Sequence, residues 1–198
     1  LDKILASLKS AAGDSKIKGI YLKTSTVSAA PASVKAIRDA LMEFKKSGKF
    51  VYAYSDVYTQ NGYYMSTVAD KILLNPSGDM SLKGYAFQLM CYKNPIDKMD
   101  VAVQIFRHGQ FKSAVEPYFL DKMSEANREQ MSTLANSLWQ VFLQDVSKAR
   151  NISIDDLNNI ADNLLCSSPK AALELKLVDQ LAYADEAEKL IKVKLNLG

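Results

Sequence analysis

The stretch KFVYAYSDVYTQNGYYMSTVADKILL, residues 49–74, decides the fold class. Its first six residues are rich in aromatic and β-branched side chains, which is typical of a strand, and KILL at 71–74 predicts a second strand. Between these two runs the sequence predicts a small helix from about Gln60 to Ala69. A strand, a helix and a further strand in this order are the unit from which mostly parallel sheets are built.

The same alternation continues towards both ends of the chain. KIKGIYLKT at 16–24 predicts a strand, LDKILASLKSAAG at 1–13 predicts a helix, and VAVQIF at 101–106 predicts one more strand. Residues 33–46 predict an amphipathic helix, because their apolar positions fall on one stripe: Val34, Ile37, Leu41 and Phe44. We therefore expect an α/β fold, with a mostly parallel sheet and helices on its flanks.

The second half of the chain is predicted to be helical. A long helix is expected from Ser124 to Arg150, about twice the average length. It could project from the domain and pack on a neighbour, or lie along its own sheet, and the sequence leaves both open. Short helices follow, with Ser153 and Ser168 as caps and Pro169 in a first turn. The stripe of the long helix is Met131, Leu134, Leu138, Val141, Phe142 and Val146.

The composition is that of a globular protein. With 198 residues, 48% hydrophobic and 24% charged, the chain can form a single domain over residues 1–198. The net charge of +3 comes from scattered lysines, so we expect no nucleic-acid binding. No apolar run approaches the ~20 residues of a membrane span. The start at Leu1, with no initiator Met and no signal-peptide pattern, suggests a piece of a longer protein that could carry an anchor or export signal.

Most catalytic and cofactor motifs are absent from the sequence. Cys91 and Cys166 form no metal or redox spacing, and core positions are favoured over a mutual disulfide. No GxGxxG, P-loop or metal-spaced acidic cluster is present, so no cofactor and no metal are expected. His108 is the single histidine, and without a GxSxG elbow a Ser-His-Asp triad is not supported.

Lys112 is the candidate catalytic residue. It lies in HGQFKSAVEPYF, residues 108–119, directly after Phe111. Burial lowers the pKa of a lysine because a low dielectric penalises the ammonium form, and the neutral amine can then act as a general base. The nearby Glu116 would favour the charged form, so we expect its carboxylate to point away. Taken alone, these residues also fit an ordinary lysine whose amine reaches solvent.

Four segments, taken in order, resemble a known protease family. They are residues 47–87, HGQFKSAVEPYFLDKMSEANREQ at 108–130, VFLQDVSKARNIS at 141–153 and KAALELKLVDQLAYADEAEKLI at 170–191. Together they are similar to the amino-terminal half of the long form of the signal peptide peptidase A family, also called protease IV. That resemblance implies a Clp protease/crotonase-like fold of repeated ββα units with a helical extension. It also implies a membrane-associated serine protease with a Ser/Lys dyad.

The resemblance assigns the general base to Lys112, because the family's Tyr-Lys-Ser-Ala stretch corresponds to residues 111–114 here. The nucleophile is missing: where a serine-bearing half has Ser-Gly-Gly-Tyr at a helix start, this chain has Gln60, Asn61, Gly62 and Tyr63. The family's Pro-Gly-Gly turn, whose amides help hold the oxyanion, is replaced by residues 26–30, TVSAA. The remaining hydroxyls lack the activating turn: Ser25, Ser28 and Ser66.

The resemblance also implies partners and a location. The serine would come from the carboxy-terminal half of the same protein, the substrates would be peptides such as cleaved signal peptides, and the isolated chain would be inactive. A ring or bowl of further copies is implied, with the 124–150 helix as a candidate contact. The family faces the extracytoplasmic (periplasmic) side of a bacterial inner membrane, and membrane association would come from parts outside this chain.

Two other functions stay open at this point. The chain could be a non-catalytic interaction or ligand-binding module on a crotonase-type scaffold, with Lys112 in an ordinary salt bridge. Acyl-CoA chemistry is less favoured, because the Gly-rich turns that hold a thioester oxyanion are missing from the sequence.

Overall fold

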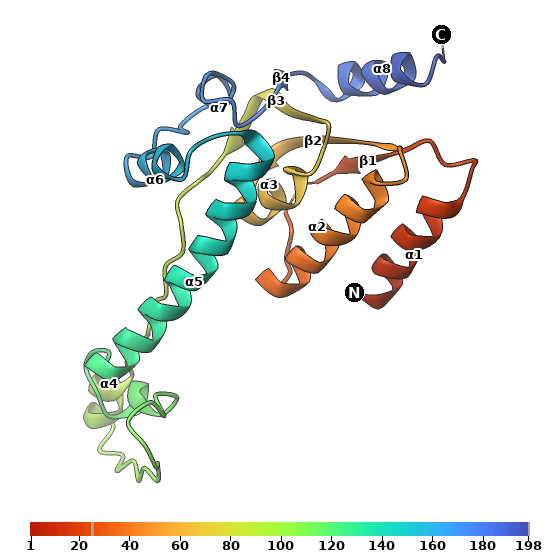
Figure 1. Ribbon diagram of the computed structural model, residues 1–198. Helices are drawn as coiled ribbons and strands as arrows, with labels where there is room; N and C mark the ends of the chain where they lie inside the picture. The colour runs from red at the N-terminus through yellow and green to blue at the C-terminus, as the bar shows by residue number, and fades with distance from the viewer. Residues whose placement is uncertain (25, 198) are drawn as a thin grey trace. The chain divides into compact units, whose positions relative to one another are not determined.

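The computed structural model describes residues 1–24 and 26–197 and divides into two compact units (Figure 1). The sheet unit consists of Leu1–Lys83 with Phe142–Gly198, and the loop unit consists of Gly84–Val141. The expectation of a single domain over residues 1–198 stays a prediction.

A parallel sheet forms the centre of the sheet unit. Its four strands are β1 (Gly19–Lys23), β2 (Phe50–Tyr58), β3 (Lys71–Met80) and β4 (Gln180–Leu181), hydrogen-bonded in that order. The predicted α/β alternation is therefore confirmed, whereas the short β4 has no strand signal in the sequence. The register pairs Gly19 with Phe50, Tyr52 with Lys71, and Leu73 with Gln180.

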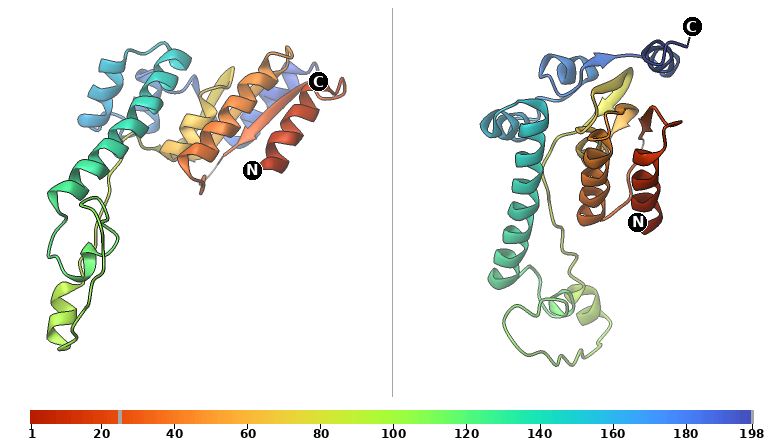
Figure 2. Two further views of the ribbon diagram at one scale, coloured as in Figure 1. Left: turned by 60° about the horizontal axis from the view of Figure 1, so that its bottom comes forward. Right: turned by 45° about the vertical axis from the view of Figure 1, so that its right-hand side comes forward.

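Helices lie on both faces of this sheet (Figure 2). In both sets of views α1 (Asp2–Gly13) and α2 (Pro31–Lys45) lie side by side on one face, and α8 (Ala184–Lys194) lies on the other. The short helix α3 (Gln60–Ser66) connects β2 to β3, as predicted.

The core of the sheet unit follows from the apolar stripes. On one face the predicted stripe of α2 buries Val34, Leu41 and Phe44. On the other face Ala187 of α8 packs with Tyr54 and Leu73, both of which have no exposed surface. Burying the stripe of each helix against the sheet is what holds these elements together.

The long helix and the caps that follow it are confirmed. α5 spans Glu125–Arg150, and α6 (Ile154–Asp162) and α7 (Pro169–Glu174) follow it. The hydroxyl oxygens of Ser153 and Ser168 accept hydrogen bonds from the third residue beyond each, at 3.0 and 3.2 Å. Both serines are thus N-caps.

The predicted apolar stripe of α5 is buried only at its carboxyl end. Phe142 and Val146 are 2% and 0% exposed, whereas Leu134 and Val141 are 44% and 41% exposed. The sequence therefore identified the helix correctly, and the described chain leaves part of its apolar stripe exposed.

The predicted strand at 101–106 is wrong. Among the residues that the structure describes, this segment pairs with no strand. β-Branched composition favours an extended backbone, but a strand also needs a neighbour with which to exchange hydrogen bonds. The loop unit instead contains a short helix, α4 (Lys93–Lys98), and a 3-10 turn, η1 (Glu116–Tyr118). The Tyr92 ring, just before α4, stacks on Tyr118 at 6.1 Å.

Candidate active site

Lys112 lies on a loop of the loop unit, residues 107–116, which we call the lysine loop. The backbone N–H of Lys112 donates to the carbonyl of Gly109 at 3.4 Å, which closes a turn. Gly109 has a φ of 91°, a conformation that residues with a side chain rarely adopt. The described chain leaves the Lys112 side chain exposed.

An open hollow of about 470 Å³ lies at the lysine loop. The ring of Phe106 at its edge is 91% exposed, and that of Phe111 is 45% exposed. The Lys112 amine and two exposed aromatic residues therefore share one surface. The hollow is lined by Phe106, Arg107, His108, Phe111, Lys112, Ser113, Ala114 and Val115.

Glu116 is fully buried at the carboxyl end of the lysine loop. Its Oε1 accepts from the Ser124 hydroxyl at 2.6 Å, and its Oε2 accepts from the Asn127 amide at 2.9 Å. Burial by itself would raise the pKa of the Glu116 carboxyl, but these hydrogen bonds and the charge of Arg107 outweigh it, so the pKa lies below its usual value. Both carboxylate oxygens are thus engaged by groups other than Lys112, in line with the expected orientation.

The network around Glu116 extends to the other end of the loop. The guanidinium of Arg107 lies 3.6 Å from Glu116 Oε1 and stands over the ring of Phe119 at 5.1 Å. Ser124 Oγ also accepts from the backbone N–H of Asn127 at 3.2 Å, so it caps the start of α5. Sequence reasoning missed this network; the signal that could have revealed it was a serine placed to cap the helix eight residues after the glutamate.

The serine-equivalent position lies in the sheet unit. Helix α3 begins at Gln60, and Thr59 Oγ1 caps it by accepting from Gly62 at 3.3 Å. Gln60 Oε1 accepts from the backbone N–H of Lys83 at 3.2 Å. An amide cannot replace a serine hydroxyl as nucleophile. Of the nearby serines, Ser66 is fully buried, Ser28 is exposed, and Ser25 lies outside the described residues.

The other reactive side chains offer no nucleophilic site. Cys91 and Cys166 are both free, and burial raises the pKa of the Cys166 thiol to about 11, which disfavours the reactive thiolate. His108 is exposed at the hollow of the lysine loop, whose described lining residues include Ser113 but no aspartate or glutamate to complete a Ser-His-Asp triad.

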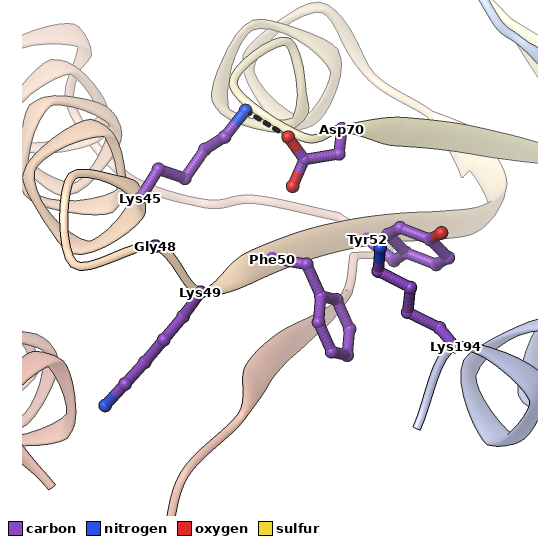
Figure 3. A pocket seen from close by; sticks show the side chains of 7 residues that line it. All are labelled: Lys45, Gly48, Lys49, Phe50, Tyr52, Asp70 and Lys194. Carbon is purple, nitrogen blue, oxygen red and sulfur yellow. Dashed lines mark ion pairs between the residues drawn. The ribbon is translucent and has the colours of Figure 1, made fainter. Parts of the chain in front are cut away.

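A second hollow lies in the sheet unit, and two of the three lysines that line it, Lys45 and Lys49, are engaged by other groups (Figure 3). Lys45 pairs with Asp70 at 2.7 Å, and Lys49 donates to the backbone carbonyls of Ala11 and Asp14 at 2.5 and 2.6 Å. Its described lining residues include no serine, cysteine or histidine. We therefore place the candidate chemistry at the lysine loop.

Comparison with known proteins decides the family. The sequence profile of Peptidase family S49 matches residues 43–198, which include the α3 region and the lysine loop. The chain belongs to peptidase family S49. It is 39% identical over 196 residues to "Protease 4" of Salmonella typhi, covering 95% of this chain and 32% of that relative.

Other S49 relatives agree. "Protease 4" of Haemophilus influenzae is 32% identical over 186 residues, covering 92% of this chain and 29% of the relative. "Serine protease SPPA, chloroplastic" of Arabidopsis thaliana is 27% identical over 197 residues, covering all of this chain and 29% of the relative. This S49 chain thus spans about a third of the length of the relatives it matches.

The resemblance to the signal peptide peptidase A family is therefore confirmed at the level of the S49 family. The role of Lys112 stays a prediction. Within residues 1–24 and 26–197 of this S49 chain, no helix has both the length and the apolar character that a membrane crossing requires.

Proposed function

We propose that this chain supplies the general base of a serine peptidase with a Ser/Lys dyad, and that the serine lies in a companion half of the same protein. The observation that carries the proposal is the exposed turn that presents Lys112, in an S49 chain whose α3 begins with Gln60 rather than serine. A Clp protease/crotonase-like fold of ββα units is part of the same proposal, supported by the parallel sheet flanked by helices.

The exposure of Lys112 fits a site completed by a second surface. A lysine works as a base only when its amine is neutral, and removal of water favours the neutral form. Phe106 and Phe111 stand uncovered beside it. When the serine-bearing half covers the lysine loop, these rings and the amine lose water together, and loss of water favours a neutral amine.

The chemistry follows from a neutral amine next to a hydroxyl. Lys112 Nζ takes the proton as the serine Oγ bonds to the peptide carbonyl carbon. The C–N bond then breaks, the leaving amine receives that proton from Nζ, and an acyl-enzyme remains. Water then attacks the acyl carbon with Nζ again as base, the bond from that carbon to Oγ breaks, Oγ receives the proton from Nζ, and the carboxylic acid product leaves. Oxyanion donors would come from the companion half, since residues 26–30 contain no glycine.

Apolar peptides, such as remnants of cleaved signal peptides, are the proposed substrates. A pocket of about 200 Å³ in the loop unit opens beside Ser113 and Ala114, directly after Lys112. Its lining is mainly apolar, as the apolar core of a signal peptide requires. Its apolar lining residues are Phe87, Leu89, Ala114, Pro117, Met123 and Met131.

Location and assembly belong to the proposal as well. The extracytoplasmic face of a bacterial inner membrane, reached through parts outside this chain, is where such substrates arise. A ring of copies would cover the apolar side chains that α5 leaves exposed, such as Leu134 and Val141.

Reaction of the full-length gene product with a serine-reactive fluorophosphonate tests the proposal. Lys112→Ala should abolish labelling, whereas Lys122→Ala, an exposed lysine of the same unit, should leave it intact. If Lys112→Ala leaves labelling unchanged, the alternative of a non-catalytic interaction or ligand-binding module is favoured. The coding sequence beyond residue 198 should contain a homologous segment with Ser-Gly-Gly-Tyr. Peptide turnover by the 198-residue chain alone, lost on Lys112→Ala, would refute the division of the dyad.

A further inference from the structure

We infer that Glu116 is the positioning residue of the lysine loop: its buried carboxylate joins the two ends of the loop and fastens them to the first turn of α5. The inference rests on the proposed function, because it assigns Glu116 its importance through Lys112.

Glu116 closes the loop at its base. Arg107 and Glu116 are the first and last residues of the loop, and their side chains form an ion pair at 3.6 Å. Lys112 lies near the middle of the segment between them, on the turn made with Gly109. Joining the ends of a segment removes most of its conformational freedom, so the ion pair restricts where the lysine can be.

Glu116 also ties the loop to a rigid element. Ser124 donates to it through both its hydroxyl, at 2.6 Å, and its backbone N–H, at 3.3 Å. Asn127, in the first turn of α5, donates at 2.9 Å. Hydrogen bonds are directional, so several donors converging on one carboxylate fix its position relative to the helix.

The loop unit has few other means of holding this loop. Of residues 84–141, all of which the structure describes, Glu116 and Asn127 are the only ones that are buried, at 0% and 3% exposed. Phe111 and Lys112 are exposed. The centre of this unit is therefore a polar pair, and the shape of the lysine loop depends on it more than on apolar packing.

The same contacts keep the carboxylate away from the base. A carboxylate bonded to Lys112 would hold the amine in its charged form. Ser124, Asn127 and Arg107 together occupy both oxygens of Glu116, which places its negative charge at the base of the loop instead. Glu116 thus positions the lysine without pairing with it.

The test is steady-state kinetics of the full-length gene product on an apolar peptide. A general base must come within about 3 Å of its proton, and a displacement of about 1 Å can cost 100-fold in rate. We expect Glu116→Gln to lower kcat about tenfold to 100-fold and to change KM less than about twofold. Ser124→Ala, which removes one of the bonds, should act in the same direction but less.

Hydrogen exchange on the same preparations supplies a second measurement. Exchange of amides 107–116 should become faster in Glu116→Gln, while that of β2 and β3 stays unchanged. The matched control is Glu129→Gln, the same chemical change at an exposed position of α5, which should leave both kcat and exchange as they are.

The outcomes separate the two proposals. If Lys112→Ala abolishes turnover but Glu116→Gln keeps the original kcat, the inference is wrong and the proposed function stands. If kcat falls only in proportion to the fraction of serine that a fluorophosphonate can titrate, Glu116 is merely structural. If Lys112→Ala keeps full turnover, the proposed function fails and the positioning role fails with it, whatever the exchange shows.

Discussion

The sheet unit and the loop unit are held together by different kinds of contact. In the sheet unit, apolar and aromatic side chains such as Tyr54 and Leu73 are completely buried between helices and strands. In the loop unit the buried residues are the polar Glu116 and Asn127. Many of its large apolar side chains are exposed: Phe87, Met90, Tyr92, Met99, Val101, Val103, Phe106, Phe111, Tyr118, Leu134 and Val141.

This difference separates a region that is complete in itself from one that is not. Burial of apolar surface makes the dominant favourable contribution to folding, and the sheet unit buries such surface between its helices and strands. The loop unit leaves many of its large apolar side chains exposed, and its two buried residues are held by directional polar bonds. The proposed active site is shared between two halves. It requires a surface on this chain that holds one residue in a fixed position and leaves its apolar side chains exposed for the other half to cover.

Truncation in the two units should give the largest contrast. We expect Leu73→Ala to lower the free energy of unfolding by about 2–5 kcal/mol, because it leaves a cavity in the buried core. The same change at Leu134, which is 44% exposed, should cost less than about 0.5 kcal/mol. Urea unfolding followed by circular dichroism measures both. Equal losses would show that the loop unit has a core of its own.

Removal of the polar centre should have the next largest effect. Asn127→Leu takes away the donor at 2.9 Å and leaves an oxygen of Glu116 buried without that partner. We expect a loss of about 1–3 kcal/mol, felt in the loop unit. Asn136→Leu, at an exposed position of α5, is the control and should be near neutral. Hydrogen exchange resolved by segment distinguishes loss in residues 84–141 from loss in the sheet.

A smaller effect is expected from the turn that presents the lysine. Gly109→Ala forces a side chain into a φ of 91°, at a cost of about 1–2 kcal/mol, although no atom obstructs the new methyl group. Gly13→Ala, where φ is ordinary and space is also open, should cost nothing comparable. Proteolysis at Lys112, followed by mass spectrometry, should become faster in the first variant alone.

The smallest expected effect is a dependence on pH confined to the loop unit. The pKa of Glu116 is lower in the folded chain than in the unfolded one. The carboxylate of Glu116 therefore contributes fully to stability at a pH above its pKa in the unfolded chain, which is about 4.3. This contribution is lost as the pH falls through its pKa in the folded chain. Trp139, the single tryptophan and a residue of the loop unit, reports the change by fluorescence. Glu116→Gln should remove that dependence, and its persistence in this variant would assign it to another group.

The sheet unit could be predicted from the sequence because its signals are local. The strand, helix and strand of residues 49–74, the stripe of α2 and the caps at Ser153 and Ser168 each depend on neighbouring residues or on helical spacing. The two-residue β4 could not be predicted in this way. It exists because β3 offers it an edge, which is a property of the assembled sheet.

The loop unit was harder to predict because its contacts join residues with no common pattern. Residues 101–106 have the composition of a strand, but a composition does not supply a partner. Lys112 was singled out by its neighbours and by family resemblance, and its role still awaits experiment. The hydrogen bonds of Glu116 with Ser124 and Asn127 connect a turn to a helix, so no repeating pattern in the sequence predicts them.

The unpaired segment 101–106 has a practical consequence for handling the chain. Val101, Val103 and Phe106 are 53%, 42% and 91% exposed, in a segment that belongs to no helix or strand. An exposed apolar run with β-prone residues that can accept another strand is a template on which identical molecules stack into fibrils. Concentrated stocks of the 198-residue chain should therefore gel or bind thioflavin with time. Gln104→Lys would slow this, because like charges would then face each other in every stacked layer.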